Sequence, residues 1–219
     1  MPQVDTKKQT GAEAVSTEMV IMHNTLIRAI NAIYIQAVNV ATKGSAKDKS
    51  DFASYAYQWS VSVASHHKLE EVAIFPRIGR ETGVENIMET CVEEHHAFEA
   101  GLETYEKYLG EVKAGKSELD GQKLRDLIDA VMPTLYAHLE NEIDTLMSLK
   151  QYDDKCDVEK IFREELQKAV DFAMKDSVYR VSCPPKDEII HFQPKDVSNQ
   201  HCSTERATAH RFYQPRQEV

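Results

Sequence analysis

Two short motifs in this chain place a carboxylate one helical turn after an imidazole. His66 precedes Glu70 by one such step, and His138 precedes Glu142 by the same step. Residues i and i+4 stack on one face of a helix, so each pair could offer a nitrogen and an oxygen to one metal ion. These two pairs are the strongest candidates for chemistry in the sequence.

Comparison of the chain with itself places the two pairs in an internal repeat. The pairs are 72 residues apart, and two further histidines, His23 and His95, are separated by the same offset. A fixed offset indicates a repeated structural unit, which divides the block 16–149 into two equivalent halves. We therefore add His23 and His95 to the candidate metal ligands.

Apolar residues recur at helical spacing in long blocks, and glycines lie at the junctions between the blocks. The blocks predict helices over about 16–42, 47–78, 84–113, 119–149 and 156–175. In an up-down-up-down bundle, residues equidistant from a turn lie level with each other, and each midpoint between successive candidate histidines falls on a predicted turn. Each histidine also lies on the apolar stripe of its helix, so all four should meet inside the bundle.

The predicted fold class is all-α, because the chain is 42% hydrophobic and 28% charged with few glycines and prolines. We expect an up-down-up-down four-helix bundle with a short fifth helix and an irregular C-terminal tail. The expected divisions are a disordered N-terminal segment at 1–16, the bundle at 17–150, the additional helix at 151–176 and the tail at 177–219.

The overall charge and the cysteines exclude several classes of function. A net charge of −10 argues against nucleic acid or an anionic membrane as a partner, because both require a basic surface. The first residues are polar and no stretch approaches the ~20 apolar residues of a membrane span. The four cysteines have no C-x-x-C spacing, which argues against a cysteine zinc site or a disulfide framework. We therefore expect a cytoplasmic protein.

Four imidazoles and two carboxylates exceed the needs of one tetrahedral zinc ion, and calcium or magnesium would prefer oxygen ligands throughout. Mixed nitrogen and oxygen ligation suits iron, and manganese less well. Because the repeat supplies one His-His-Glu set per half, a centre of two metal ions is expected, with Glu70 and Glu142 as bridging ligands. A purely structural polar network is the alternative, although unpartnered groups of this kind would cost several kcal/mol in a core.

Two of the histidines are doubled, which leaves the register open. In the repeat, His66 and His95 align with histidines, whereas His67 aligns with a leucine and His96 with an asparagine. We therefore expect His67 and His96 to lie beside the ligands or on the surface. The rival frame of His67 with Glu71 has the same spacing and stays open.

The ordered motifs resemble the hemerythrin-like, HHE cation-binding family over roughly 17–150. The motifs are the lone His23, HHKLEEVAIFP at 66–76, EEHHAFEAGL at 93–102 and HLENE at 138–142. The resemblance implies a four-helix bundle that holds two iron ions, bridged by carboxylates and an oxo or hydroxo group. Members of the family bind dioxygen, sense oxygen or iron, or oxidise or reduce small molecules.

The sequence departs from the oxygen-carrying members of that family at two positions. By this resemblance, the oxygen-carrying members have a further histidine at the position of Glu99 and an aspartate at the position of Glu142. Glu99 is either a seventh ligand or a solvated side chain, and a carboxylate ligand would favour more oxidised iron.

Three functions follow as alternatives. The first is a di-iron protein that binds or responds to dioxygen or another small oxidant. The second is a di-iron oxidase, oxygenase or peroxide-handling enzyme with a small-molecule substrate. The third is a metal-free scaffold.

Overall fold

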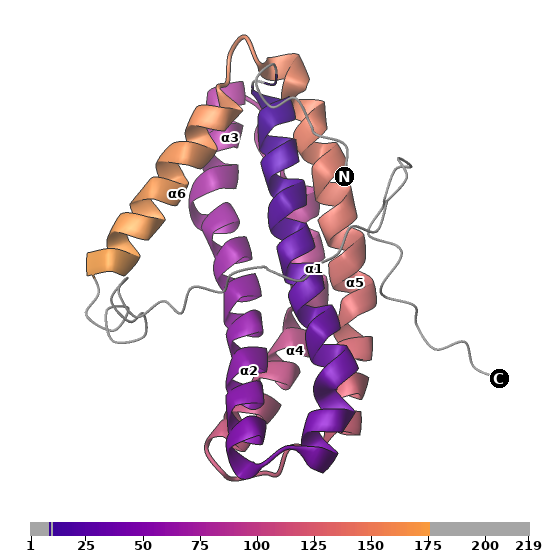
Figure 1. The fold of residues 1–219 in the computed structure, drawn as a ribbon. Coiled ribbons are helices and arrows are strands. Elements are labelled where there is room, and N and C mark those ends of the chain that lie inside the picture. The colour runs from indigo at the N-terminus through magenta and orange to yellow at the C-terminus, as the bar shows by residue number, and fades with distance from the viewer. Residues whose placement is uncertain (1–8, 10, 176–219) are drawn as a thin grey trace, which may run out of the picture.

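The computed structural model describes residue 9 and residues 11–175, which form helices and no strand (Figure 1). This part of the chain confirms the all-helical class. The elements in order are α1 (Ala12–Lys43), α2 (Ala46–Leu69), the π-helix η2 (Glu70–Ile74), α3 (Phe75–Thr82), α4 (Glu89–Lys113), α5 (Gly121–Ser148), the 3-10 helix η3 (Leu149–Tyr152) and α6 (Val158–Lys175).

Four long helices surround a common interior. Helix α1 packs against α2 and α5, and α4 packs against the same two neighbours (Figure 1). Ser45 begins α2 with a capping box, in which its side chain and that of Asp48 each accept from the other's backbone N–H. Gly121 begins α5 at its contact with α1. A larger residue would not fit there, because a Cβ would lie 2.4 Å from the carbonyl oxygen of Ala37.

Several element boundaries differ from the sequence-based expectation. Helix α1 begins at Ala12 rather than near residue 16, so part of the segment expected to be disordered is helical. Helix α4 begins at Glu89 rather than near 84, because Gly83 and Asn86 take positive φ values in the preceding connection. The predicted tail at 177–219 lies outside the described residues. Among the helices that the structure describes, none is long and apolar enough to cross a membrane.

The helix predicted over 47–78 contains a π turn that the periodicity did not reveal. The backbone N–H of Phe75 donates to the carbonyl of Glu70, five residues earlier, instead of to residue 71. Pro76 follows immediately and has no N–H to offer the carbonyl of Val72, so a regular α-helical ladder would be broken here. The wider turn lets the helical segment of α2 and η2 continue into α3, and such turns are frequent at functional sites.

The apolar interior consists of two separate clusters. One fills the half of the bundle that contains Trp59 and Tyr105, and the other lies near Val15, Phe75 and Leu146. Buried histidines and glutamates occupy the level between them. The core is therefore interrupted by one polar layer, to which all four long helices or their extensions contribute.

Helix α6 adds to the second cluster from outside the bundle. Val158 and Ile161 are fully buried there, and in Figure 1 the helix begins beside α3 and diverges from α2 toward its end. The Arg77 guanidinium of α3 bonds to Glu164 and Glu165 of α6, at 2.7 and 2.9 Å. The first turns of α6 are thus held both by apolar burial and by this ion-pair network.

Replacing Arg77 by alanine is expected to loosen α6. Because the partner carboxylates are partly exposed, the free energy of unfolding should fall by only about 1 kcal/mol. The more specific result is faster amide hydrogen exchange in α6, measured by mass spectrometry, with the four long helices unchanged. Arg163→Ala is the matched control, because Arg163 pairs with Glu159 inside α6. Equal exchange in the two variants would contradict this account of how α6 is attached.

Candidate metal centre

The polar layer between the two apolar clusters gathers all the histidines and carboxylates predicted from the repeat. Helix α1 contributes one imidazole, α2 and η2 contribute two imidazoles and a carboxylate, α4 contributes one imidazole, and α5 contributes one imidazole and a carboxylate. These side chains are His23, His66, His67, Glu70, His95, His138 and Glu142. Glu142 and His138 have no exposed surface, and Glu70 is 1% exposed.

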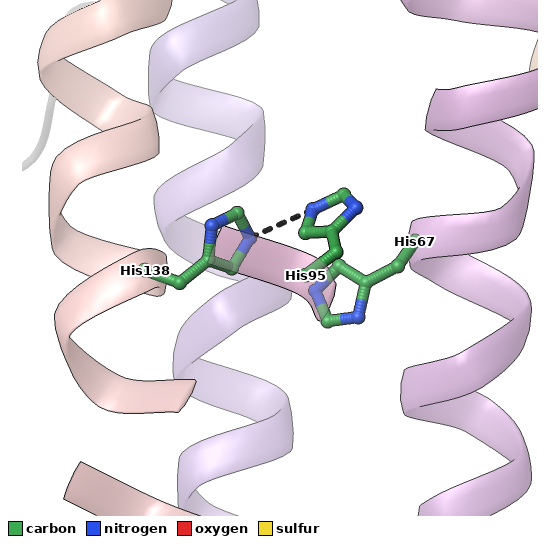
Figure 2. Close-up of side chains that lie close together, drawn as sticks. All are labelled: His67, His95 and His138. Carbon is green, nitrogen blue, oxygen red and sulfur yellow. Dashed lines mark hydrogen bonds between the residues drawn. The ribbon is translucent and has the colours of Figure 1, made fainter. Parts of the chain in front are cut away.

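The donor atoms form three groups, each compact enough to hold a metal ion, and the third, of His66, His67 and Glu70, overlaps both of the first two. The first contains His67, His95 and His138, and Figure 2 shows these three rings turned toward one another. In this group the Nε2 atoms of His95 and His138 are 3.1 Å apart. The second group contains His23 and His66 with the Glu142 carboxylate, and within each group the donor atoms lie within 4.8 Å of one another.

Both buried carboxylates lie between the two groups. Glu70 Oε1 is 3.3 Å from His66 Nε2, and its other oxygen, Oε2, is 3.8 Å from His95 Nε2. Glu142 Oε2 is 3.1 Å from His23 Nε2 and 3.8 Å from His138 Nε2. Each carboxylate therefore reaches the imidazoles of both groups, which is the position a bridging ligand requires.

Three of the imidazoles are oriented by an acceptor on their outer side. His23 Nδ1 donates to the backbone carbonyl of Leu139 at 2.9 Å. His95 Nδ1 donates to Glu71 at 2.8 Å, and His138 Nδ1 of α5 donates to Glu94 of α4 at 3.1 Å. A proton on Nδ1 leaves the lone pair on Nε2, which faces the interior, so these rings are fixed in the tautomer that binds metals.

The inner donor atoms lack the partners that buried polar atoms normally have. Neither ring nitrogen of His67 nor any carboxylate oxygen of Glu70 and Glu142 makes a hydrogen bond within the described residues. Glu142 Oε2 is close to the His23 ring, but the two are not aligned as a hydrogen bond. Buried and unpartnered groups of this kind are costly, and bound metal ions would provide partners for the two carboxylates and for one ring nitrogen of His67.

The electrostatics of the layer agree with that interpretation. Burial, reinforced by the Glu142 carboxylate, raises the pKa of Glu70 well above its usual value. Burial also lowers the pKa of His66 and that of His138 to about 3, so both imidazoles are neutral and carry free lone pairs. Neutral imidazoles around two opposed carboxylates form a donor set that fits cations.

The structure places His67 inside the polar layer and not on the surface. We expected it to lie beside the ligands or on the surface, but it is 5% exposed and belongs to the three-histidine group. Between residues 63 and 74, the buried side chains of α2 and η2 are Val63, His67, Glu70 and Ile74, a stripe with steps of three and four residues. That stripe is the signal that could have identified His67. The other doubled residue, His96, is exposed, in agreement with the expectation.

Glu99 is not brought into the layer. Its side chain is exposed, and it belongs to none of the donor groups. The buried position one turn after His95 is instead Phe98, whose ring packs against His67 and His138. The idea of Glu99 as a seventh ligand is therefore not supported by its position.

Fold and site together define an all-helical protein with a buried histidine and glutamate centre suited to metal binding. The family model for the hemerythrin HHE cation binding domain matches residues 15–149, so the chain belongs to that family and carries a metal-binding domain.

A curated relative is the dimeric xanthone biosynthesis cluster protein R11 of Cryptosporiopsis sp. (strain 8999). It is 32% identical over 137 residues, which are 63% of this chain and 50% of the relative. The chain thus matches about half of the relative's length. No solved structure matches the chain.

Proposed function

We propose that this chain is a non-haem di-iron protein that binds or responds to dioxygen. The observation that carries the proposal is the division of the donors into two adjacent groups with Glu70 and Glu142 between them. One iron would be held by His67, His95 and His138, and the other by His23 and His66. That list of ligands differs from the sequence-based one by the gain of His67 and the loss of Glu99.

The wider fold is proposed to be the up-down-up-down bundle of the family. The ring of packed neighbours among α1, α2, α4 and α5 supports this order. The short connections from α1 to α2 and from α4 to α5 support it too, because short loops join antiparallel neighbours.

Iron is favoured over the other ions by the number of imidazoles. Five imidazoles with two carboxylates suit iron better than manganese, and they are unsuited to calcium or magnesium. When bound, a pair of irons would supply electron transfer and a binding position for dioxygen.

The two groups differ in their number of imidazoles, so the two metal positions are not equivalent. The group of His23 and His66 has one imidazole fewer than the other group, so an ion held there would leave more room for a small molecule. Buried apolar clusters cover this layer toward both ends of the bundle. Both features suit the binding of a small apolar molecule such as dioxygen.

The proposal is tested by iron content and optical spectra, recorded under nitrogen and then in air. Two irons per chain and a spectrum that changes in air and reverts under nitrogen are expected. Protein purified in the presence of iron that holds less than one metal ion per chain would overturn the proposal.

An enzymatic role is the second candidate, favoured by the printed name of the relative, which assigns that protein to a biosynthesis cluster. In this reading the chain would be a di-iron oxidase, oxygenase or peroxide-handling enzyme. Irreversible loss of the reduced spectrum in air, with consumption of an added organic compound or peroxide, would favour it over reversible binding.

Removing the carboxylate that orients His138 is expected to weaken metal binding without unfolding the protein. Glu94→Ala deprives His138 Nδ1 of its acceptor, and such partners typically contribute roughly 10- to 100-fold in metal affinity. Iron affinity is measured by competition with a chelator. Glu93→Ala on the same helix is the control, because Glu93 is exposed and contacts none of the ligands. Equal affinities in the two variants would contradict an orienting role for Glu94.

A further inference from the structure

A surface cavity of about 460 Å³ lies between α2 and α4, directly beside the three-histidine group. Its lining includes His67, His95, Phe98 and Leu102, all of which are buried, so they form its inner wall. A volume of this size suits a compound of one or two rings. The cavity therefore brings a small molecule within contact of two of the proposed ligands.

The position of the cavity follows from the way the three-histidine group is built. Its third imidazole comes from α2, as His67, and not from α4 one turn after His95. Position 99 of α4 is thus free to face solvent, and Glu99 lines the outer part of the cavity. The residue that departs from the oxygen-carrying members is thereby part of the cavity wall.

The charges around the cavity are mostly negative. Glu71, Glu99 and Glu106 line it, against the single ammonium group of Lys68. Glu71 already accepts from His95, and Glu106 accepts from Tyr57 at 3.0 Å. Within the described residues, the Glu99 carboxylate has no hydrogen-bond or ion-pair partner, so it is available to a ligand.

We propose that this cavity binds a small organic cation, with its ammonium group at Glu99 and its apolar body against Phe98, Leu102 and Val61. Val61 and Ala64 of α2 extend the apolar wall toward solvent. An anion of the same size would face three carboxylates, and a neutral molecule would gain no charge interaction with Glu99. The net charge of −10 also favours the approach of cations over that of anions.

The site is formed by protein side chains alone, so its occupation does not require the proposed irons. It would give the enzymatic alternative a substrate class, and it would give a dioxygen-responsive protein a second ligand. The two proposals can therefore fail independently.

Three probes with one ring and different head groups test the charge preference: 2-phenylethylamine, 2-phenylethanol and 3-phenylpropanoate. Each is titrated by NMR into the full chain, and iron content is measured on the same samples. The amine is expected to bind at least about 3-fold more tightly than either other probe, the scale of one partly exposed ion pair. Equal affinities, or no binding of the amine up to the order of 10 mM, would overturn the proposal.

Two variants test the place of binding. Glu99→Gln is expected to remove the preference for the amine, and Glu103→Gln is the matched control, because Glu103 is exposed on α4 but does not line the cavity. Ala64→Trp is expected to weaken all binding at least about 10-fold by filling the cavity, and the exposed position of Ala64 spares the core. Unchanged amine binding in Glu99→Gln or in Ala64→Trp would overturn the assignment.

Discussion

Replacing His67 by alanine is expected to leave the protein with one iron per chain instead of two. The three-histidine group would retain only His95 and His138, and the Nε2 atoms of these two rings would lack the third nitrogen that completes their site. Glu70 would still reach His66, so the group at His23 would keep its ligands. Iron per chain, measured by elemental analysis after gel filtration, gives the result directly.

His96→Ala is the matched control for His67→Ala, because the two side chains belong to doubled histidines but His96 is exposed. We expect the control to keep both irons. Circular dichroism checks that both variants are folded. Two irons in a folded His67→Ala protein would show that His67 is not a ligand, and the frame derived from the repeat would then apply.

Replacing Glu70 by leucine is expected to abolish the paired metal centre and to stabilise the metal-free protein. Glu70 is 1% exposed, faces a second carboxylate and has no hydrogen-bond partner in the described residues. An unpartnered polar group costs about 1–3 kcal/mol to bury, so a leucine of similar volume should stabilise the metal-free protein by about that amount. Urea denaturation of the chelator-treated proteins at neutral pH measures the difference in free energy of unfolding.

Iron should reverse that order of stability. A metal that binds only the folded state stabilises it according to its free concentration and affinity, so the wild-type protein gains with iron and Glu70→Leu gains little. Glu103→Leu, on the exposed face of α4, controls for a general effect of exchanging glutamate for leucine in a helix. A metal-free Glu70→Leu protein that is less stable than the wild type would mean that Glu70 contributes to folding without a metal.

The sequence predicted the helical class and identified most of the residues that lie in the polar layer. The repeat assigned His23, His66, His95 and His138 to one level, and all four lie in the polar layer. This succeeded because the spacing of residues about a turn determines their height in a bundle, and height does not depend on side-chain packing.

The repeat could not identify His67, because its counterpart in the second half is Leu139. A repeat identifies what the two halves share, whereas His67 gives the first donor group a third imidazole that the second group lacks. The sequence left open whether Glu99 is a ligand or a solvated side chain, for a related reason. Residues three and four positions after His95 are both near its face, and here packing turned the apolar Phe98 inward and left the carboxylate in solvent.

The π turn was equally invisible to helical periodicity. It arises from the missing N–H of Pro76, a local effect that shifts the ladder without altering which residues are apolar. The outer acceptors Glu71 and Glu94 were missed because charged residues beside a motif are common in exposed helices. Only their contacts with His95 and His138 distinguish them.

The division of the apolar interior has a consequence for how the molecule opens. Each cluster has its own set of packed side chains, and the side chains between them gain little from one another until cations join them. Without metal, the two ends of the bundle should exchange amide hydrogens as separate cooperative units, and with metal as one. The metal-bound centre would then couple the two ends of the bundle into one cooperative folding unit.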